Sequence, residues 1–180
     1  EIFGLPAFTY SYREAVIDGF LVDHDPPVRI GTMLSEGGIH FSRDDQVDFI
    51  HPTSGAVQPA TLPDDIDFEV EQFNKGVITV PFNRAIAEEL TKFIDPSLPD
   101  KTLVFAVSDA HADTLVNELR LAFRKAFGPL PDATVQKITG KVDKVGKLIR
   151  SFRNDPQPRV AVTVDLLTTG IDIPRISNLV

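Results

Sequence analysis

The second half of the chain alternates short apolar runs with helix-length amphipathic segments. The run TLVFAV at residues 102–107 leads into Ser108, whose hydroxyl can cap a helix, and Gly128 with Pro129 would end that helix. Apolar side chains recur along it at helical spacing, at Leu115, Val116, Leu119, Phe123 and Phe127. The pattern therefore predicts a buried strand followed by an amphipathic helix.

A second cycle of strand and helix follows directly. The pattern predicts a strand near residues 134–138, a helix near 142–152, a turn at 154–156 and a strand at 160–164. Strands this apolar are typical of a parallel sheet that is covered on both faces. The expected fold class is therefore α/β, with a parallel sheet flanked by helices.

One more helix is predicted upstream of this alternation. Asn83 can cap it, and it would end before Pro96. Its shared apolar face would hold Ile86, Leu90, Phe93 and Ile94. The acidic residues 63–71 carry little apolar periodicity and predict an exposed connection, so a domain boundary is expected near Gly76.

The residues before that boundary predict a partial α+β segment. A short helix is expected at residues 12–20. Strands are expected at residues 28–34 and 38–50, around a turn-prone stretch at 36–38.

Charge is distributed unevenly along the 180 residues, whose formal net charge is −8. Residues 1–100 hold 6 basic and 18 acidic side chains, a balance of −12. Residues 101–180 hold 12 basic and 8 acidic side chains, a balance of +4. The second segment is therefore the one that could face a polyanion.

Composition excludes several classes of protein and site. The chain has no cysteine, which excludes a disulfide framework, a cysteine zinc site and a cysteine nucleophile. It has no apolar run of the roughly 20 residues that span a bilayer, so a cytoplasmic protein without a membrane partner is expected. No two histidines have the i, i+3 or i, i+4 spacing of helical metal ligands, so no metal site is predicted and all four are interpreted as surface residues: His24, His40, His51 and His111.

Residues 140–148 superficially resemble a phosphate-binding glycine loop. Five residues separate Gly140 from Gly146 where the Walker A pattern has four, and Leu148 stands where a hydroxyl should meet magnesium. We interpret this stretch as the first turn of a helix. Its basic side chains could form a stripe for nucleic acid or an ordinary solvated helix face: Lys141, Lys144, Lys147, Arg150 and Arg153.

The strongest local signal is VAVTVDLLTTGIDIP at residues 160–174, where an apolar strand runs into a polar turn. Ligands of open α/β sheets bind at the edge where the strands end. Thr168, Thr169 and Gly170 supply hydroxyls and an unobstructed backbone for a phosphate, and Asp172 offers a carboxylate for a ribose, a basic side chain or a metal-bound water. A capped structural turn is the alternative.

These residues resemble motifs of the second RecA-like domain of superfamily 2 helicases and translocases. TTGIDIPRISNLV is similar to motif V, and TLVFAVSDAHADTLVNEL is similar to motif IV. Within the superfamily, VDLLTTGIDIP and the early stretch IFGLPAFTYSYREAVIDGFLVD are most similar to the motor (R) subunit of type I restriction-modification enzymes.

The resemblance implies a domain organisation. Residues 1–62 would be the tail of the first RecA-like domain, 63–76 a linker, and 77–180 a second RecA-like domain without its motif VI. The Walker A, Walker B and coupling motifs would precede Glu1 and motif VI would follow Val180, as in an internal piece of a longer polypeptide.

The resemblance also implies site residues and partners. Gly170 and Asp172 would face the nucleotide, and no catalytic residue is expected in this chain. The residues implied toward DNA are Ser108, Thr139, Gly140, Asp165, Thr168 and Thr169. ATP and Mg²⁺ would be bound mainly by other parts of the polypeptide. The implied partners are double-stranded DNA and the modification and specificity subunits of a type I restriction complex.

One position departs from the family pattern. Many relatives have a threonine directly before the aspartate of motif V, whereas Val164 precedes Asp165 here and the hydroxyl lies one residue earlier, at Thr163. On a strand that shift moves the hydroxyl to the other face. Two other functions remain open: a different superfamily 2 repair translocase or RNA helicase, and a non-catalytic α/β interaction module.

Overall fold

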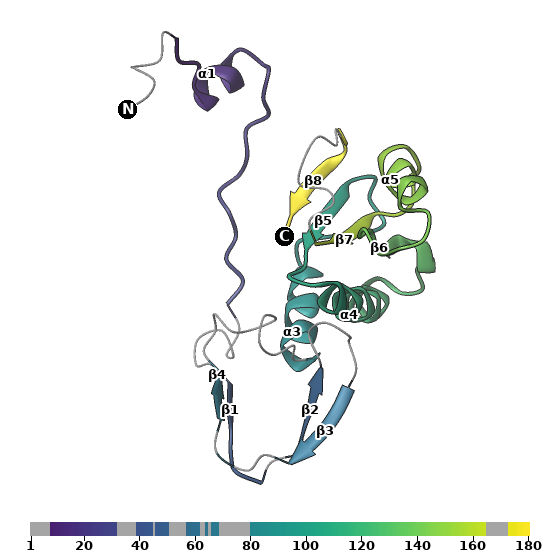
Figure 1. Ribbon diagram of the computed structural model, residues 1–180. Coiled ribbons are helices and arrows are strands. Elements are labelled where there is room, and N and C mark those ends of the chain that lie inside the picture. The colour runs from purple at the N-terminus through teal and green to yellow at the C-terminus, as the bar shows by residue number, and fades with distance from the viewer. Residues whose placement is uncertain are drawn as a thin grey trace.

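The computed structural model describes residues 8–31, 39–44, 46–50, 57–61, 64, 66–68, 80–164 and 173–180. Its best-packed part is a four-stranded sheet in the second half of the chain (Figure 1). The strands are β5 (Lys101–Phe105), β6 (Val135–Lys137), β7 (Val160–Thr163) and β8 (Ile176–Leu179), in the order β6-β7-β5-β8. All three pairings are parallel, which confirms the predicted α/β class.

Three helices cover the two faces of this sheet. They are α3 (Val80–Leu90), α4 (Asp109–Phe127) and α5 (Val145–Asn154). Side chains alternate across a strand, so Val104 of β5 packs with residues of α3 and α4, and the preceding Leu103 packs with residues of α5. This two-sided burial explains why the apolar run of β7, VAVT, is buried at every position.

The long helix α4 begins and ends where the sequence predicts. The Ser108 hydroxyl accepts a hydrogen bond from the His111 N–H at 3.1 Å, and Asp109 adds a negative charge to the first turn. Gly128 ends the helix at φ 83°, a left-handed conformation that favours glycine.

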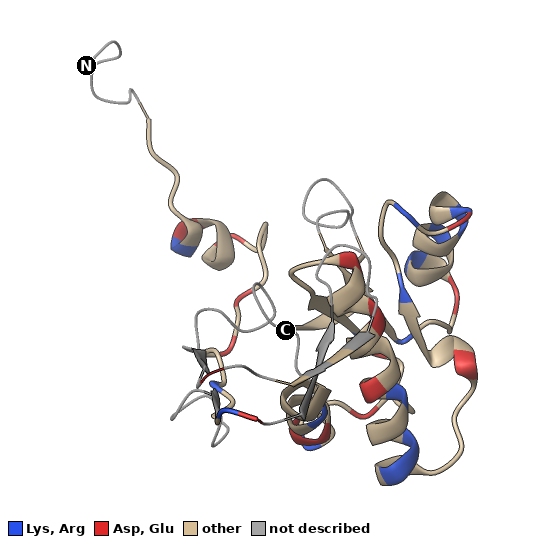
Figure 2. Ribbon diagram, turned by 60° about the horizontal axis from the view of Figure 1, so that its bottom comes forward, with Lys and Arg blue, Asp and Glu red and all other residues tan. Residues whose placement is uncertain are grey.

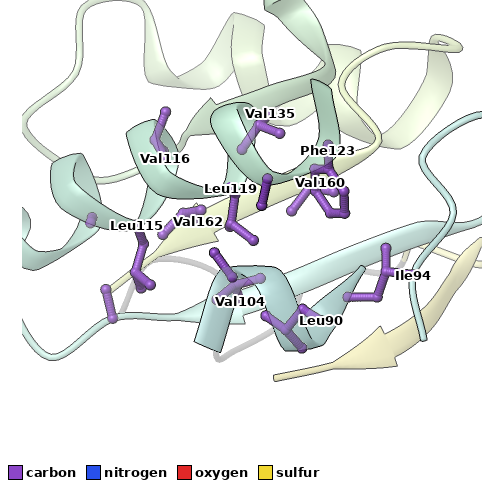
Figure 3. Close-up of a cluster of buried hydrophobic side chains, with 14 residues drawn as sticks. Leu90, Ile94, Val104, Leu115, Val116, Leu119, Phe123, Val135, Val160 and Val162 are labelled. Carbon is purple, nitrogen blue, oxygen red and sulfur yellow. The ribbon is translucent and has the colours of Figure 1, made fainter. Parts of the chain in front are cut away.

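The main core lies between α3, α4 and one face of the sheet (Figure 3). Leu119 and Phe123 of α4 are fully buried there, against Val104, Val160 and Val162. A smaller cluster on the other face joins α5 to the sheet through Phe152, which is also fully buried.

A lysine is buried at the start of β5. The Lys101 ammonium donates to the carbonyl oxygens of Asp155 and Pro158, at 2.9 and 2.8 Å, and lies over the Phe152 ring. Burial, with help from the positive charges of Arg159 and Arg175, lowers the pKa of Lys101 to about 8. Lys101 therefore anchors the connection between α5 and β7.

The described residues before α3 form one helix and four short strands. Helix α1 (Tyr12–Ile17) ends three residues before the predicted end at residue 20, and it starts with a capping box between Ser11 and Glu14. The strands form two antiparallel pairs: β1 (Ile39–Phe41) with β4 (Ile66–Phe68), and β2 (Gln46–Ile50) with β3 (Val57–Thr61).

Several predictions for this half are wrong in detail. The strand expected at 28–34 is not formed in its described part, 28–31, and the strand expected at 38–50 is divided by a turn into β1 and β2. β4 lies within the stretch expected to be an exposed connection. An apolar-polar alternation of only three residues is too short to distinguish such a strand from a loop.

The helix before the sheet also differs from its prediction. Asn83 does not cap α3 but lies inside it, because the helix already includes Val80. The helix ends at Leu90 in a turn, so Phe93 leaves the apolar face and is 52% exposed, while Ile94 stays buried. In the described part of the chain, no helix combines the length and apolar composition needed to cross a membrane.

Two leucines of α4 provide a matched test of the core. Leu119 is fully buried and Leu121 is 56% exposed. Leu119→Ala should lower the free energy of unfolding by about 2–5 kcal/mol, because it removes buried methyl groups and leaves a cavity. Leu121→Ala should change it by less than about 1 kcal/mol. Urea unfolding of both variants measures the difference, and equal losses would contradict the packing described.

Candidate nucleic-acid interface at the carboxyl edge of the sheet

The carboxyl ends of β5, β6 and β7 meet at one edge of the sheet, because these strands run parallel in the order β6-β7-β5. Ser108 follows β5, and Thr139 with Gly140 follows β6. The structure thus brings to one edge three of the residues predicted to face DNA. The edge where strands end is also where open α/β sheets bind ligands.

Five predicted site residues lie outside the described residues. They belong to the stretch after β7, at 165–172, and are Asp165, Thr168, Thr169, Gly170 and Asp172. Their roles stay predictions. Thr163, which carries the hydroxyl that is displaced in this motif, lies within the described residues. Its side chain is fully buried and cannot reach DNA in this conformation.

Ser108 has a structural task that leaves part of its hydroxyl available. One lone pair of the oxygen accepts the His111 N–H, as the cap of α4. A serine hydroxyl also carries a proton and a second lone pair. The half-buried Ser108 side chain can therefore cap the helix and donate to a phosphate oxygen at the same time.

Thr139 and Gly140 differ in what they can offer. The Thr139 side chain is 3% exposed, and its hydroxyl donates to the Asp109 carboxylate at 2.6 Å. It therefore holds the end of β6 against the start of α4, and its side chain is not available to DNA. Gly140 is exposed and has open space where a side chain would be, so its backbone can be approached closely.

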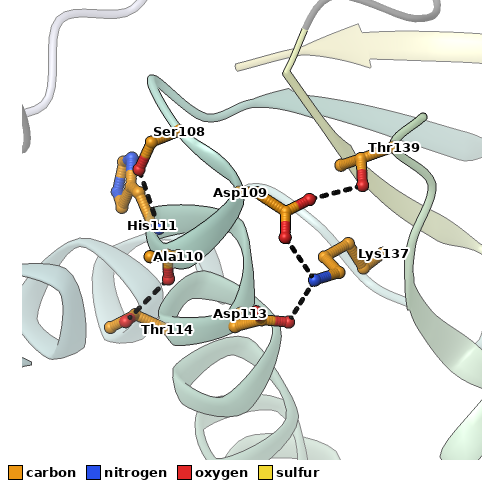
Figure 4. A network of polar contacts seen from close by, with 8 residues as sticks. All are labelled: Ser108, Asp109, Ala110, His111, Asp113, Thr114, Lys137 and Thr139. Carbon is orange, nitrogen blue, oxygen red and sulfur yellow. Dashed lines mark hydrogen bonds and ion pairs between the residues drawn. The ribbon is translucent and has the colours of Figure 1, made fainter. Parts of the chain in front are cut away.

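A polar network fixes this edge (Figure 4). The Lys137 ammonium lies between Asp109, at 3.0 Å, and Asp113, at 2.7 Å. The hydrogen bond from Thr139, together with the charge of Lys137, lowers the pKa of Asp109 against the opposing effect of burial. Burial lowers the pKa of Lys137, but its bonds to Asp113 and Asp109 outweigh burial and raise it. Both groups therefore stay ionised at neutral pH.

His111 is not the surface residue that the sequence analysis predicts. It is 5% exposed, its Nδ1 accepts the Val107 N–H at 3.2 Å, and its Nε2 lies 2.9 Å from the Asn83 side-chain oxygen. A backbone N–H can only donate, so Nδ1 carries no proton and Nε2–H donates to Asn83. Burial lowers the pKa of His111 to about 4, and the ring is neutral.

The His111 bonds connect three elements at the edge. They join the turn after β5, through Val107, to the first turn of α4 and to Asn83 on α3. The sequence contains a signal for the burial of His111, because this residue lies four residues before Leu115 on the apolar side of α4.

Comparison with known proteins identifies the relatives of this chain. It is 50% identical over 184 aligned residues to the endonuclease subunit of the type I restriction enzyme EcoKI from Escherichia coli K12, and the match covers all of the chain. The chain is a relative of type I restriction endonuclease subunits. The EcoAI endonuclease subunit of Escherichia coli is 29% identical over 177 residues, 96% of the chain.

The relationship concerns one part of those proteins. The chain spans 16% of the length of the EcoKI subunit and 20% of that of the EcoAI subunit. No protein-family model matches the chain. The predicted relationship to the R subunit of type I restriction enzymes is confirmed.

The buried histidine predicts an acid-sensitive fold. Between pH 6.5 and about 4 the unfolded chain binds a proton at His111 that the native chain does not, so stability should fall as pH falls through this window. The greatest loss is about 3 kcal/mol. Urea unfolding of wild type and His111→Gln at several pH values measures it.

The matched control is the exposed His24. His24→Gln should keep the wild-type dependence on pH, whereas His111→Gln should flatten it between pH 4 and 6.5. If both variants keep the full slope, the buried neutral imidazole is not its source.

Proposed function

We propose that this chain supplies the second RecA-like domain of the ATP-dependent DNA translocase motor in a type I restriction endonuclease. The observation that carries the proposal is the carboxyl edge of the parallel sheet, which holds Ser108 and Gly140 and at which β7 ends, shortly before the motif at 165–172. The 50% identity to the EcoKI subunit supports the same assignment.

The edge suits a grip on a phosphate backbone. The Ser108 hydroxyl and the open backbone at Gly140 can donate to phosphate oxygens without reading bases. Thr168 and Thr169 would extend this surface. A carboxylate repels phosphate, so Asp165 would orient neighbouring amides and hydroxyls. Thr139 would act from beneath, by holding β6 to α4 through Asp109.

The nucleotide would contact the motif at 165–172 through Gly170 and Asp172. ATP and Mg²⁺ would be held mainly by other parts of the longer polypeptide. In this proposal the motif contacts ATP, and the closure of the two RecA-like domains that ATP causes moves the DNA-binding edge. Double-stranded DNA and the modification and specificity subunits would be its partners.

Two variants of the motif test the nucleotide-facing assignment in the intact restriction enzyme. Asp172→Ala should reduce ATP-driven translocation about 10²-fold, the usual effect of losing one fixed electrostatic contact. Gly170→Val should abolish it, since a β-branched side chain would obstruct the backbone. Asp100→Ala is the control, because Asp100 is exposed just before β5, at the amino edge of the sheet. Displacement of a DNA triplex measures translocation.

Thermal unfolding of the same preparations separates function from folding. The proposal expects Asp172→Ala to melt like wild type. A lowered melting temperature with normal translocation would mean that Asp172 caps a structural turn.

The chain alone should not turn over ATP. The lysine and carboxylate with which such motors bind phosphate and magnesium are expected in other parts of the polypeptide. Phosphate release, measured with and without duplex DNA, should stay at the level of a protein-free control. DNA-stimulated release by the 180-residue chain would show that a complete nucleotide site lies within it.

A further inference from the structure

The outward surface of α5 carries basic side chains that are left without ionic partners. Lys144, Lys147 and Arg150 are exposed, and none forms an ion pair with a residue that the structure describes. The helix itself, VGKLIRSFRN, contains no aspartate or glutamate. Figure 2 shows the resulting concentration of basic residues on this helix.

Helical geometry directs these cations away from the sheet. Each residue of an α-helix advances by about 100°, so Lys147 and Arg150 lie about 150° from the centre of the apolar face. That face is formed by the buried Phe152 and the half-buried Val145, Leu148 and Ile149, which pack on the sheet. Lys144 flanks the outer surface at the start of the helix.

Basic residues on and next to α3 and α4 differ from those of α5, because they form ion pairs within the chain. Lys125 pairs with Glu88 at 2.8 Å, and Arg124 pairs with Asp132. Lys92, in the turn after α3, pairs with Glu89. These three cations are therefore paired within the chain, whereas Lys144, Lys147 and Arg150 form no ion pair with a described residue.

The α5 surface adjoins the candidate interface. β6 ends at the carboxyl edge, and the chain passes from there through Thr139 and Gly140 into Lys144 and α5. Lys141, in this connection, lies near enough for its charge to help lower the pKa of Asp109. An anion held along the edge would thus meet the start of α5 next.

We propose that Lys144, Lys147 and Arg150 bind the phosphate backbone of duplex DNA that also contacts the carboxyl edge. This inference rests on the proposed function and adds to it a surface outside the family motifs. The three residues span about 9 Å of helix axis, the rise of two to three nucleotides along one strand. Two lysine ammonium groups and one arginine guanidinium at this spacing suit phosphates, and contacts to phosphates give no base specificity.

Two triple variants of the full 180-residue chain test the proposal. The first is Lys144→Gln with Lys147→Gln and Arg150→Gln. The control is Lys92→Gln with Lys125→Gln and Arg124→Gln, which removes the same number of lysines and arginines from the paired surface. Glutamine keeps helix propensity. Affinity for two unrelated fluorescent duplexes is measured by anisotropy over a series of salt concentrations.

For wild type, the logarithm of affinity should fall linearly with the logarithm of salt concentration. The α5 variant should bind both duplexes more weakly, with a slope reduced by about 0.9 for each phosphate that the protein no longer neutralises, up to about 3 in all. The control variant should keep the wild-type slope. If the triple variant melts at a lower temperature, the single variants Lys147→Gln and Arg150→Gln replace it. Each single variant should reduce the salt slope by about 1.

The outcomes separate this inference from the function on which it rests. If wild type binds DNA and the α5 variant has the same salt slope, the inference alone is overturned. The basic face of α5 is then an ordinary solvated helix face. An equal loss in both triple variants would overturn it too, as a general effect of charge. Absence of any salt-dependent binding by wild type would overturn both the inference and a DNA-binding role for this edge.

Discussion

The candidate interface depends on one carboxylate. Asp109, the residue after Ser108, lies in the first turn of α4 and accepts hydrogen bonds from Thr139 at 2.6 Å and from Lys137 at 3.0 Å. This one side chain therefore joins the end of β6 to the start of α4. β5 and β6 are not neighbours in the sheet, because β7 lies between them. Asp109 therefore connects the segments that follow two strands that do not contact each other directly. The Lys137–Asp113 ion pair is a second link between β6 and α4.

A neutral imidazole completes this arrangement from the other side. The Val107 N–H has its partner in His111 Nδ1, and the opposite ring nitrogen reaches Asn83 on α3. The turn after β5 is thus held by an ionic network toward β6 and by uncharged hydrogen bonds toward α3. The proposed grip on DNA benefits from such rigidity, because fixed donors lose little conformational freedom on binding.

The sequence predicted the parts of this fold that rest on long periodic patterns. The apolar stripe of α4 runs the length of its 19 residues, with Ser108 and Gly128 marking its ends. The strands β5 and β7 stand out as apolar runs. It did not predict β4 or β8, which are three and four residues long and lack a distinct pattern. Nor did it predict the pairing of strands in the first half, since register arises from contacts between distant residues.

The polar residues of the site were harder to predict than its location. Parallel strands bring their carboxyl ends together, so the edge itself followed from the pattern of strands and helices. Whether Thr139 faces solvent or Asp109 depends on how α4 crosses the sheet, and the sequence does not contain that information in any local form. Lys101 illustrates the same limit, because a lysine side chain is normally exposed and only tertiary partners make its burial favourable.

The position of β8 has a consequence for the behaviour of this chain in solution. Within the described residues β8 pairs only with β5. Its last residue, Leu179, and the following Val180 are exposed, and Val180 lies beside the exposed Phe105. The opposite margin of the sheet, β6, is only three residues long. A strand with one unpaired side and apolar neighbours is a template for strand addition from a second molecule. Self-association through β8 should therefore compete with folding as the chain is concentrated, and a covering polypeptide segment at this margin would suppress it.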